Sequence, residues 1–182
     1  SATTAGHDRL AIQAGFSLLY PPVAMGAHVS ITPNHQTGRV TPLDTRWQAA
    51  RLFNLGYELD LTLLTPEELA ELAGQIAQRK AERRWVQSSR FFTLDLPGPY
   101  TGWAAVARDG SRCLVQVFQT RYDPLFAHTP VRLPFLDRDG LYRDAASGQL
   151  YGGDELATLG LTAPLIKQDD AATVWELIRE PG

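Results

Sequence analysis

The segment Arg108-Asp109-Gly110-Ser111 lies between two runs rich in apolar residues, Trp103–Ala107 and Arg112–Gln119. An Asp-Gly pair between two such runs is a strong signal for a β-hairpin, because glycine readily adopts the positive φ that a tight turn between strands requires. In the second run Cys113 alternates with valines, which predicts one buried face for that strand. This hairpin predicts an antiparallel β-domain in the second half of the chain.

Further short apolar runs follow the hairpin, and turn residues such as Asp139-Gly140 and Ser147-Gly148 separate them. We expect Asp154-Glu155 to form another turn, because two glycines precede it. About seven short strands over residues 90–182 are typical of a small β-sandwich. Beyond the hairpin, the predicted strands are Val131–Phe135, Leu141–Arg143, Gln149–Tyr151 and Thr173–Arg179.

The first half of the chain shows mainly helical signals. Thr65-Pro66-Glu67-Glu68 has the pattern of a capping box, in which a Thr side chain and a Glu three residues later cap the first turn. A second helix is predicted from Thr41-Pro42 to a stop at Gly56, and a third over Asp8–Leu18. Between these two, Ala27–Ile31 reads as a buried strand. We therefore predict an α/β part over residues 1–89 and a β-domain over residues 90–182.

Composition narrows the function classes. The chain of 182 residues has a net charge of −3, which offers no basic surface for nucleic acid, and no apolar run is long enough to span a membrane. Its single cysteine, Cys113, cannot form an internal disulfide, so we expect a reducing, cytoplasmic location. The four histidines and Cys113 lack metal-ligand spacing, and we expect neither a metal nor a cofactor.

Several stretches resemble one family, the glycoside hydrolase family 36 α-galactosidases, or melibiases, and they follow the family order. The run Pro33–Arg39 and the run Tyr151–Leu156 are the most specific. The other matching stretches are Asp8–Gln13, Ser17–Pro22, Met25–Ser30, Gly56–Leu61 and Gly140–Arg143. The resemblance covers nearly the whole chain and identifies it as a C-terminal portion of such an enzyme.

The resemblance implies a fold that combines an α/β part with a β part. Residues 1–89 would be the C-terminal part of a (β/α)8 barrel, comprising strand eight at Ala27–Ile31 and its flanking helices. Residues 90–182 would be the complete C-terminal antiparallel β-sandwich domain. Because a barrel needs about 250 residues, most of it would lie outside this chain.

The resemblance also implies a retaining glycosidase with two catalytic aspartates. The family nucleophile follows a Lys-Trp pair, and no Lys-Trp-Asp occurs here. The family acid/base is the second Asp of a Ser-Asp-x-x-Asp segment, and by register Ala5 occupies that position. Ala2 occupies the position of a neighbouring acid that contacts the sugar. Because a methyl group cannot donate a proton, we expect the isolated chain to be inactive.

Three polar residues after the predicted strand are candidate substrate-binding residues. His35 and Arg39, together with Asn34, follow the strand at the barrel face where active sites lie. The alternative is that they hydrogen-bond the loop backbone or a neighbouring subunit. His28, inside the strand, is predicted to be a core histidine whose hydrogen bonds are satisfied.

Two functions therefore remain in view. The first is the C-terminal part of an α-galactosidase acting on terminal α-D-galactosides of melibiose or raffinose type by double displacement. The second is a non-catalytic module that binds carbohydrate or mediates oligomerisation. An incomplete barrel leaves apolar strand edges without partners, so the chain is predicted to form a homo-oligomer or to cover these edges with its own domain.

Overall fold

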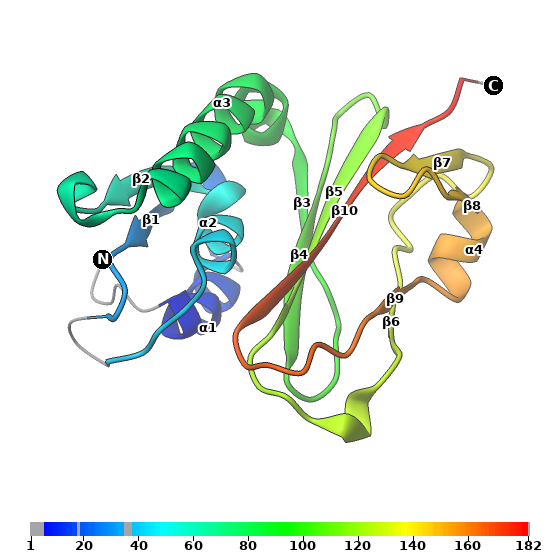
Figure 1. Cartoon of the computed structure of the whole chain (residues 1–182). Coiled ribbons are helices and arrows are strands. Elements are labelled where there is room, and N and C mark those ends of the chain that lie inside the picture. The colour runs from blue at the N-terminus through cyan, green and yellow to red at the C-terminus, as the bar shows by residue number, and fades with distance from the viewer. Residues whose placement is uncertain (1–5, 18, 35–37, 182) are drawn as a thin grey trace. The chain divides into compact units, whose positions relative to one another are not determined.

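The computed structural model describes residues 6–17, 19–34 and 38–181. Two compact units divide the chain, the first up to Gln87 and the second from Ser88 onward. Figure 1 shows mainly helices in the first unit and mainly strands in the second. None of the helices in the described part is long and apolar enough to cross a bilayer.

The first unit is built around a two-stranded parallel sheet. Strands β1 and β2 pair in register from Gly26 opposite Asn54 to Ser30 opposite Glu58, and helix α2 connects them. In order, the elements are α1 (Gly6–Phe16), the 3-10 turn η1 (Pro22–Ala24), β1 (Gly26–Ser30), α2 (Leu43–Arg51), β2 (Asn54–Glu58), η2 (Leu61–Leu63) and α3 (Pro66–Ser88).

The small apolar side chains of strand β1 are buried. Ala27 and Val29 are fully buried, and β1 and α2 are in direct contact. The strand lies close to the predicted span of 27–31. The predicted extension of the second helix to Gly56 is wrong, because α2 ends at Arg51 and a second strand follows.

Gly56 shows why the predicted end of the second helix is wrong. A glycine after a helical pattern predicts a helix stop, but Gly56 lies in the middle of β2, opposite His28. A Cβ at this position would lie 2.7 Å from Cδ2 of His28. Any other residue at this position would require the His28 ring to move, and the local sequence does not reveal this contact.

Helix α3 begins as the sequence predicts. The Thr65 hydroxyl accepts a hydrogen bond from the Glu68 N–H at 3.2 Å, and the Glu68 carboxylate accepts one from the Thr65 N–H at 2.9 Å. These two bonds satisfy main-chain donors that the first helical turn leaves free.

A buried ion pair joins α2 to α3. The Arg51 guanidinium donates to both carboxylate oxygens of Glu82, at 2.8 and 2.6 Å. The side chains are 3% and 7% exposed, and the guanidinium lies 4.9 Å from the ring centre of Trp47. This two-pronged geometry offsets the cost of burying both charges.

The second unit contains a six-stranded sheet in the order β3-β4-β5-β10-β7-β8, in which each strand pairs antiparallel with its neighbours. The predicted hairpin is confirmed, because β4 and β5 pair across the turn at Gly110, whose φ is 72°. The strands of this sheet are β3 (Arg90–Thr93), β4 (Tyr100–Val106), β5 (Arg112–Gln119), β7 (Leu141–Asp144), β8 (Leu150–Gly152) and β10 (Ala171–Arg179).

A second layer covers one face of this sheet. Strands β6 (Thr129–Val131) and β9 (Leu161–Ala163) form an antiparallel pair, and helix α4 (Gly153–Thr158) comes between them in the sequence (Figure 1). Leu133, Leu156 and Leu161 from this layer pack with Val115 and Leu177 from the sheet in one buried core. The arrangement is mostly antiparallel and consistent with a β-sandwich.

Two local predictions in this unit are wrong. The predicted strand 131–135 ends at Val131, and the chain then turns so that Leu133 enters the core. The predicted turn at Asp154-Glu155 is the first turn of α4, and the Glu155 carboxylate accepts from the Gly152 N–H at 3.2 Å. In both segments the burial of a leucine in the core, Leu133 or Leu156, decides the local structure, and the turn-forming residues do not.

The Arg51–Glu82 pair generates a stability prediction. Glu82→Leu leaves a buried guanidinium without its partner, so we expect it to lower the free energy of unfolding by about 3–5 kcal/mol. Urea unfolding followed by circular dichroism measures this loss. The double variant Arg51→Met with Glu82→Leu removes both charges and is expected to recover most of it. A double variant as unstable as Glu82→Leu alone would contradict this account.

Candidate functional site

The carboxyl ends of β1 and β2 lie at the same end of the parallel pair, which is where α/β proteins bind their ligands. A small hollow of about 120 Å³ opens there. Its lining residues come from the segments after both strands and from α2 and α3: Ile31, Thr32, Arg46, Leu59, Asp60, Leu63, Leu64 and Glu68. We call it the strand-end hollow.

Arg46 is the buried cation of the strand-end hollow. Its Nε donates to the main-chain oxygen of Thr41 at 2.9 Å, and its Nη1 donates to that of Ser30. Burial lowers the pKa of the Arg46 guanidinium, and the charges of Glu68 and Glu71 oppose this shift. Arg46 thus connects the end of β1 to the start of α2 and shapes the wall of the hollow.

Asp60 lies at the same end of the sheet and is hydrogen-bonded to Thr62. Its Oδ1 accepts from the Thr62 N–H at 2.9 Å and from the Thr62 hydroxyl at 2.6 Å, which caps η2. The Thr62 hydroxyl, followed by its N–H, lowers the pKa of the Asp60 carboxyl. Asp60 is therefore held ionised, a state that accepts hydrogen bonds but cannot donate a proton.

His28 and Glu58 form a second polar group on the sheet. The imidazole Nδ1 of His28 lies 3.8 Å from Oε1 of Glu58, and this buried nitrogen has no hydrogen-bond partner among the described residues. The His28 side chain is 29% exposed, so the prediction of a satisfied core histidine is wrong. The main-chain oxygen of His28 accepts from Arg9, whose pKa burial lowers.

Three of the site residues predicted from the sequence, Ala2, Ala5 and His35, lie outside the described residues. The other two, Asn34 and Arg39, are brought together. The Asn34 N–H donates to the Arg39 main-chain oxygen at 2.8 Å, and the Asn34 side chain is buried while Arg39 is exposed. The main chain of these two residues therefore closes the loop, and their role toward a substrate stays a prediction.

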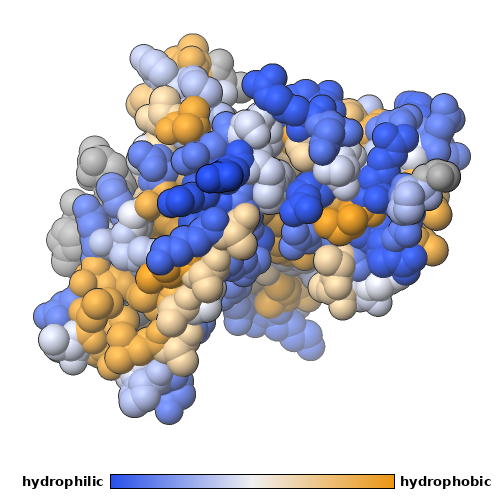
Figure 2. Space-filling view, turned by 90° about the horizontal axis from the view of Figure 1, so that it is seen from above, coloured by the Kyte–Doolittle hydropathy of each residue, from blue (hydrophilic) through white to orange (hydrophobic). Residues whose placement is uncertain are grey.

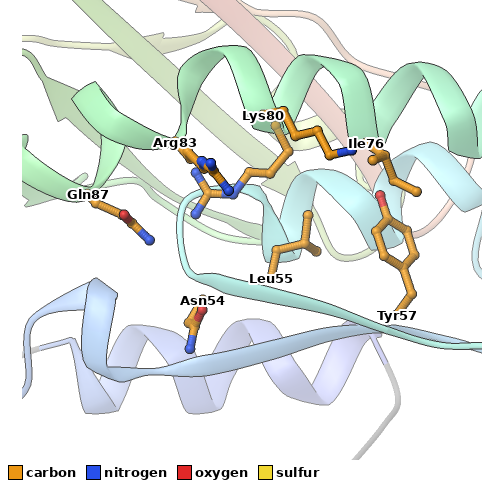
Figure 3. Close-up of a pocket in the computed structure, with 8 residues that line it drawn as sticks. Asn54, Leu55, Tyr57, Ile76, Lys80, Arg83 and Gln87 are labelled. Carbon is orange, nitrogen blue, oxygen red and sulfur yellow. The ribbon is translucent and has the colours of Figure 1, made fainter.

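A second hollow, of about 350 Å³, lies between β2 and α3. Figure 3 shows Arg83 and Gln87 of α3 near Asn54, and Ile76 near Tyr57. Tyr57 approaches Gln75 at 3.5 Å, and burial raises the pKa of its phenol to about 12. The lining residues are Asn54, Leu55, Tyr57, Ile76, Arg79, Lys80, Arg83 and Gln87. We call it the β2–α3 hollow.

Sequence reasoning missed the polar groups that depend on β2. The sequence does not single out Arg46 and Glu58, because the groups that they contact lie on other elements. The only local signal was an Asp two residues before a Thr, a pattern that caps short turns. Within the described residues, no group of three or more His, Cys, Asp or Glu is placed to hold a metal ion.

Comparison with known families matches the two parts of the chain separately. Residues 1–89 match the melibiase family model, and residues 100–177 match the model of the glycosyl hydrolase family 36 C-terminal domain. The chain is 41% identical over 179 residues to α-galactosidase AgaA of Geobacillus stearothermophilus, and 34% identical over 176 residues to α-galactosidase Mel36A of Lactobacillus acidophilus. These alignments cover 97% and 96% of this chain but only 24% of each relative.

Solved structures show the same relation. The crystal structure of the Geobacillus stearothermophilus AgaA variant A355E in complex with 1-deoxygalactonojirimycin matches with a TM-score of 0.93, over 99% of this chain and 25% of that one. The galactosidase domain of the α-galactosidase–sucrose kinase AgaSK also matches, with a TM-score of 0.93 at 33% identity over the same shares. Another AgaA variant, A355E D548N, was solved in complex with raffinose.

Tyr57 provides a titration test of the β2–α3 hollow. Because burial favours the neutral phenol, its contribution to stability is complete below pH 10 and is lost as the pH rises through about 12. The ultraviolet difference between the native chain and Tyr57→Phe isolates this phenol, and we expect its midpoint near 12. In the urea-unfolded pair the same difference is expected near 10. A native midpoint near 10 would contradict the burial of this side chain.

Proposed function

Because the chain belongs to glycoside hydrolase family 36, we propose that it is the C-terminal portion of an α-galactosidase that hydrolyses terminal α-D-galactosides of melibiose or raffinose type. The observation that carries this proposal is the ordered match of both parts of the chain to one kind of enzyme, at a TM-score of 0.93 over 99% of the chain. The chain spans about a quarter of the length of these relatives, so the activity belongs to a longer protein.

We propose that residues 1–89 form the end of a (β/α)8 barrel and that residues 90–182 form the terminal sandwich. The parallel pair β1 and β2, connected by α2, has the topology of a βαβ unit, and α3 follows as the next helix. Two strands rather than one then belong to the barrel. The loop that contains Asn34 and Arg39 would follow the penultimate strand instead of the last.

The proposed chemistry is double displacement. In such enzymes one Asp attacks the anomeric carbon and forms a galactosyl ester, while a second carboxyl group protonates the leaving oxygen. The second group then removes a proton from water, which attacks the ester and releases galactose. Neither carboxylate comes from this chain: no Lys-Trp-Asp is present, and Ala5 and Ala2 occupy the other acidic positions by register.

The role that remains for this chain is to build and support the sugar site. The strand-end hollow lies at the edge where a barrel binds its substrate, and Arg46 and Asp60 are already held there by hydrogen bonds. We assign these two residues to shaping the loops, and Asn34, His35 and Arg39 to the substrate side. A cytoplasmic location suits Cys113, whose thiol is free and buried.

The alternative function is a non-catalytic module that binds carbohydrate or mediates assembly. The substitution of both acidic positions near the N-terminus favours it. Calorimetric titration of the 182-residue chain with galactose, melibiose and raffinose separates the two functions. Saturable binding supports the module, and its absence supports a structural part of an enzyme.

A chimera tests the enzyme proposal directly. It joins the upstream three quarters of Geobacillus stearothermophilus AgaA to residues 1–182 of this chain. We expect no hydrolysis of an aryl α-galactoside by the isolated chain, because it has no nucleophile. In the chimera, Ala2→Asp with Ala5→Asp is expected to raise turnover by about 10²–10⁴-fold, the usual contribution of an acid/base group.

The matched control is Ala2→Asp with Ala5→Asn, because an amide resembles the carboxyl group in shape but cannot transfer its proton. This control is expected to stay as slow as the unmodified chimera. Added azide is expected to accelerate it with an activated aryl substrate, since azide attacks the galactosyl ester without a base. A restored chimera that folds but does not hydrolyse the substrate would overturn the proposal, as would turnover by the isolated chain.

Exposed apolar side chains in the first unit support self-association of the isolated chain. Figure 2 shows apolar atoms gathered at the surface of this unit, toward the left of the view. The exposed apolar side chains of the first unit include Phe16, Leu19, Tyr20, Val40, Leu61 and Leu63, each at least 51% exposed. Contiguous patches of this kind are usually covered in a native assembly.

We therefore expect the isolated chain to be oligomeric in solution, with the first unit at the contact. Light scattering coupled to size exclusion measures the mass, and Leu61→Asp with Leu63→Asp is expected to shift the population toward the monomer. Leu125→Asp is the matched control, because Leu125 is 87% exposed in the second unit. A monomeric mass for the unmodified chain at all concentrations would contradict this expectation.

A further inference from the structure

The β2–α3 hollow lies beside an open strand edge. Within residues 6–17, 19–34 and 38–181, β2 pairs only with β1, so its other edge has main-chain groups available to a further strand. Leu55 and Tyr57 of β2 and Ile76 of α3 form the apolar part of the lining, and each is only partly exposed. Such an edge is a template for an extended segment.

The polar part of the hollow is positively charged. Arg79, Lys80 and Arg83 line it, and none of its eight lining residues is acidic. Figure 3 shows Lys80 and Arg83 on α3, alongside β2, and both line the hollow. These side chains therefore form a basic wall above the open strand.

Arg79 is held in place but is not fully satisfied. Its Nη2 donates to the main-chain oxygen of Phe53 at 2.9 Å, whereas its buried Nη1 has no hydrogen-bond partner among the described residues. Burial lowers the pKa of the Arg79 guanidinium. The charge of Glu82 opposes this shift, and the nearby positive charges of Arg51 and Arg83 add to it. A carboxylate in the hollow would relieve this repulsion and supply the missing acceptor.

We propose that the β2–α3 hollow receives an Asp or Glu side chain from the polypeptide that precedes this chain in the complete protein. The strand that closes the proposed barrel against the open edge of β2 would carry this side chain. This inference rests on the proposed function, because that function supplies the upstream polypeptide. The relatives are about four times as long as the chain, which covers 24% of them. A second copy of this chain is the competing occupant, and the test separates the two.

The experiment uses the chimera with AgaA and a zero-length carbodiimide, which joins an amine to a carboxylate in contact with it. The chain has two lysines, Lys80 and Lys167, and Lys167 lies outside the hollow. We expect Lys80, mapped by mass spectrometry, to be joined to an acidic residue of the upstream part within the same molecule. Lys80→Arg retains the charge, lacks the amine and is expected to lose this product.

Hydrogen exchange gives an independent measurement of the strand edge. Amides of Asn54–Glu58 that do not bond to β1 are expected to exchange at least about 100-fold more slowly in the chimera than in the isolated chain. Lys80→Glu with Arg83→Glu is expected to lower the thermal midpoint of the chimera by about 3 °C and to leave that of the isolated chain unchanged. Lys167→Glu, at an exposed lysine outside the hollow, is the matched control and is expected to change neither.

Three results would overturn the inference. They are a Lys80 product that joins two differently labelled copies, no Lys80 product with unprotected β2 amides, and a charge reversal in the hollow that acts like Lys167→Glu. The activity of the chimera with Ala2→Asp and Ala5→Asp is measured separately. Restored hydrolysis with an unoccupied hollow rejects only this inference, whereas an occupied hollow without hydrolysis rejects only the proposed function.

Discussion

Parallel hydrogen bonding between β1 and β2, in register from Gly26–Asn54 to Ser30–Glu58, is the constraint on which the first unit depends. This pairing places the carboxyl ends of both strands at the same end of the sheet, so the segments containing Thr32 and Asp60 line the same small hollow. It also leaves one edge of β2 open beside α3, where the basic lining gathers. The strand-end hollow and the β2–α3 hollow therefore both follow from one pairing.

Charged groups in this unit mostly serve the architecture. Arg51 and Glu82 connect two helices through a buried, doubly hydrogen-bonded pair, and Arg46 joins the end of β1 to the start of α2. Asp60 caps η2 through Thr62. The basic residues of the β2–α3 hollow differ, because Lys80 and Arg83 face an exposed hollow that contains no acid. Among the residues that the structure describes, this contrast sets the lining of the β2–α3 hollow apart from the paired charges of the unit.

The signals that predicted the fold well act over a few residues. The capping box at Thr65 and Glu68 and the hairpin turn at Gly110 both involve neighbours in sequence, and both have the expected geometry. The errors lie where a distant element decides. Gly56 was interpreted as a helix stop although it accommodates the His28 ring, and the segment after Val131 turns to bring Leu133 into the core. For the candidate site, the sequence points to Asn34 and Arg39, whose main chains are hydrogen-bonded to each other, and their role toward a substrate stays a prediction.

By itself the sequence determined the division into a helical part and a β part, the start of α3, the hairpin and the family, because each is recorded in short, contiguous patterns. Only the tertiary structure decided that β2 exists beside β1 and that Arg51 meets Glu82, 31 residues away. It also decided that three cations converge above an open strand. These features depend on which side chains meet after the chain has folded back on itself, and local periodicity contains no information about such meetings.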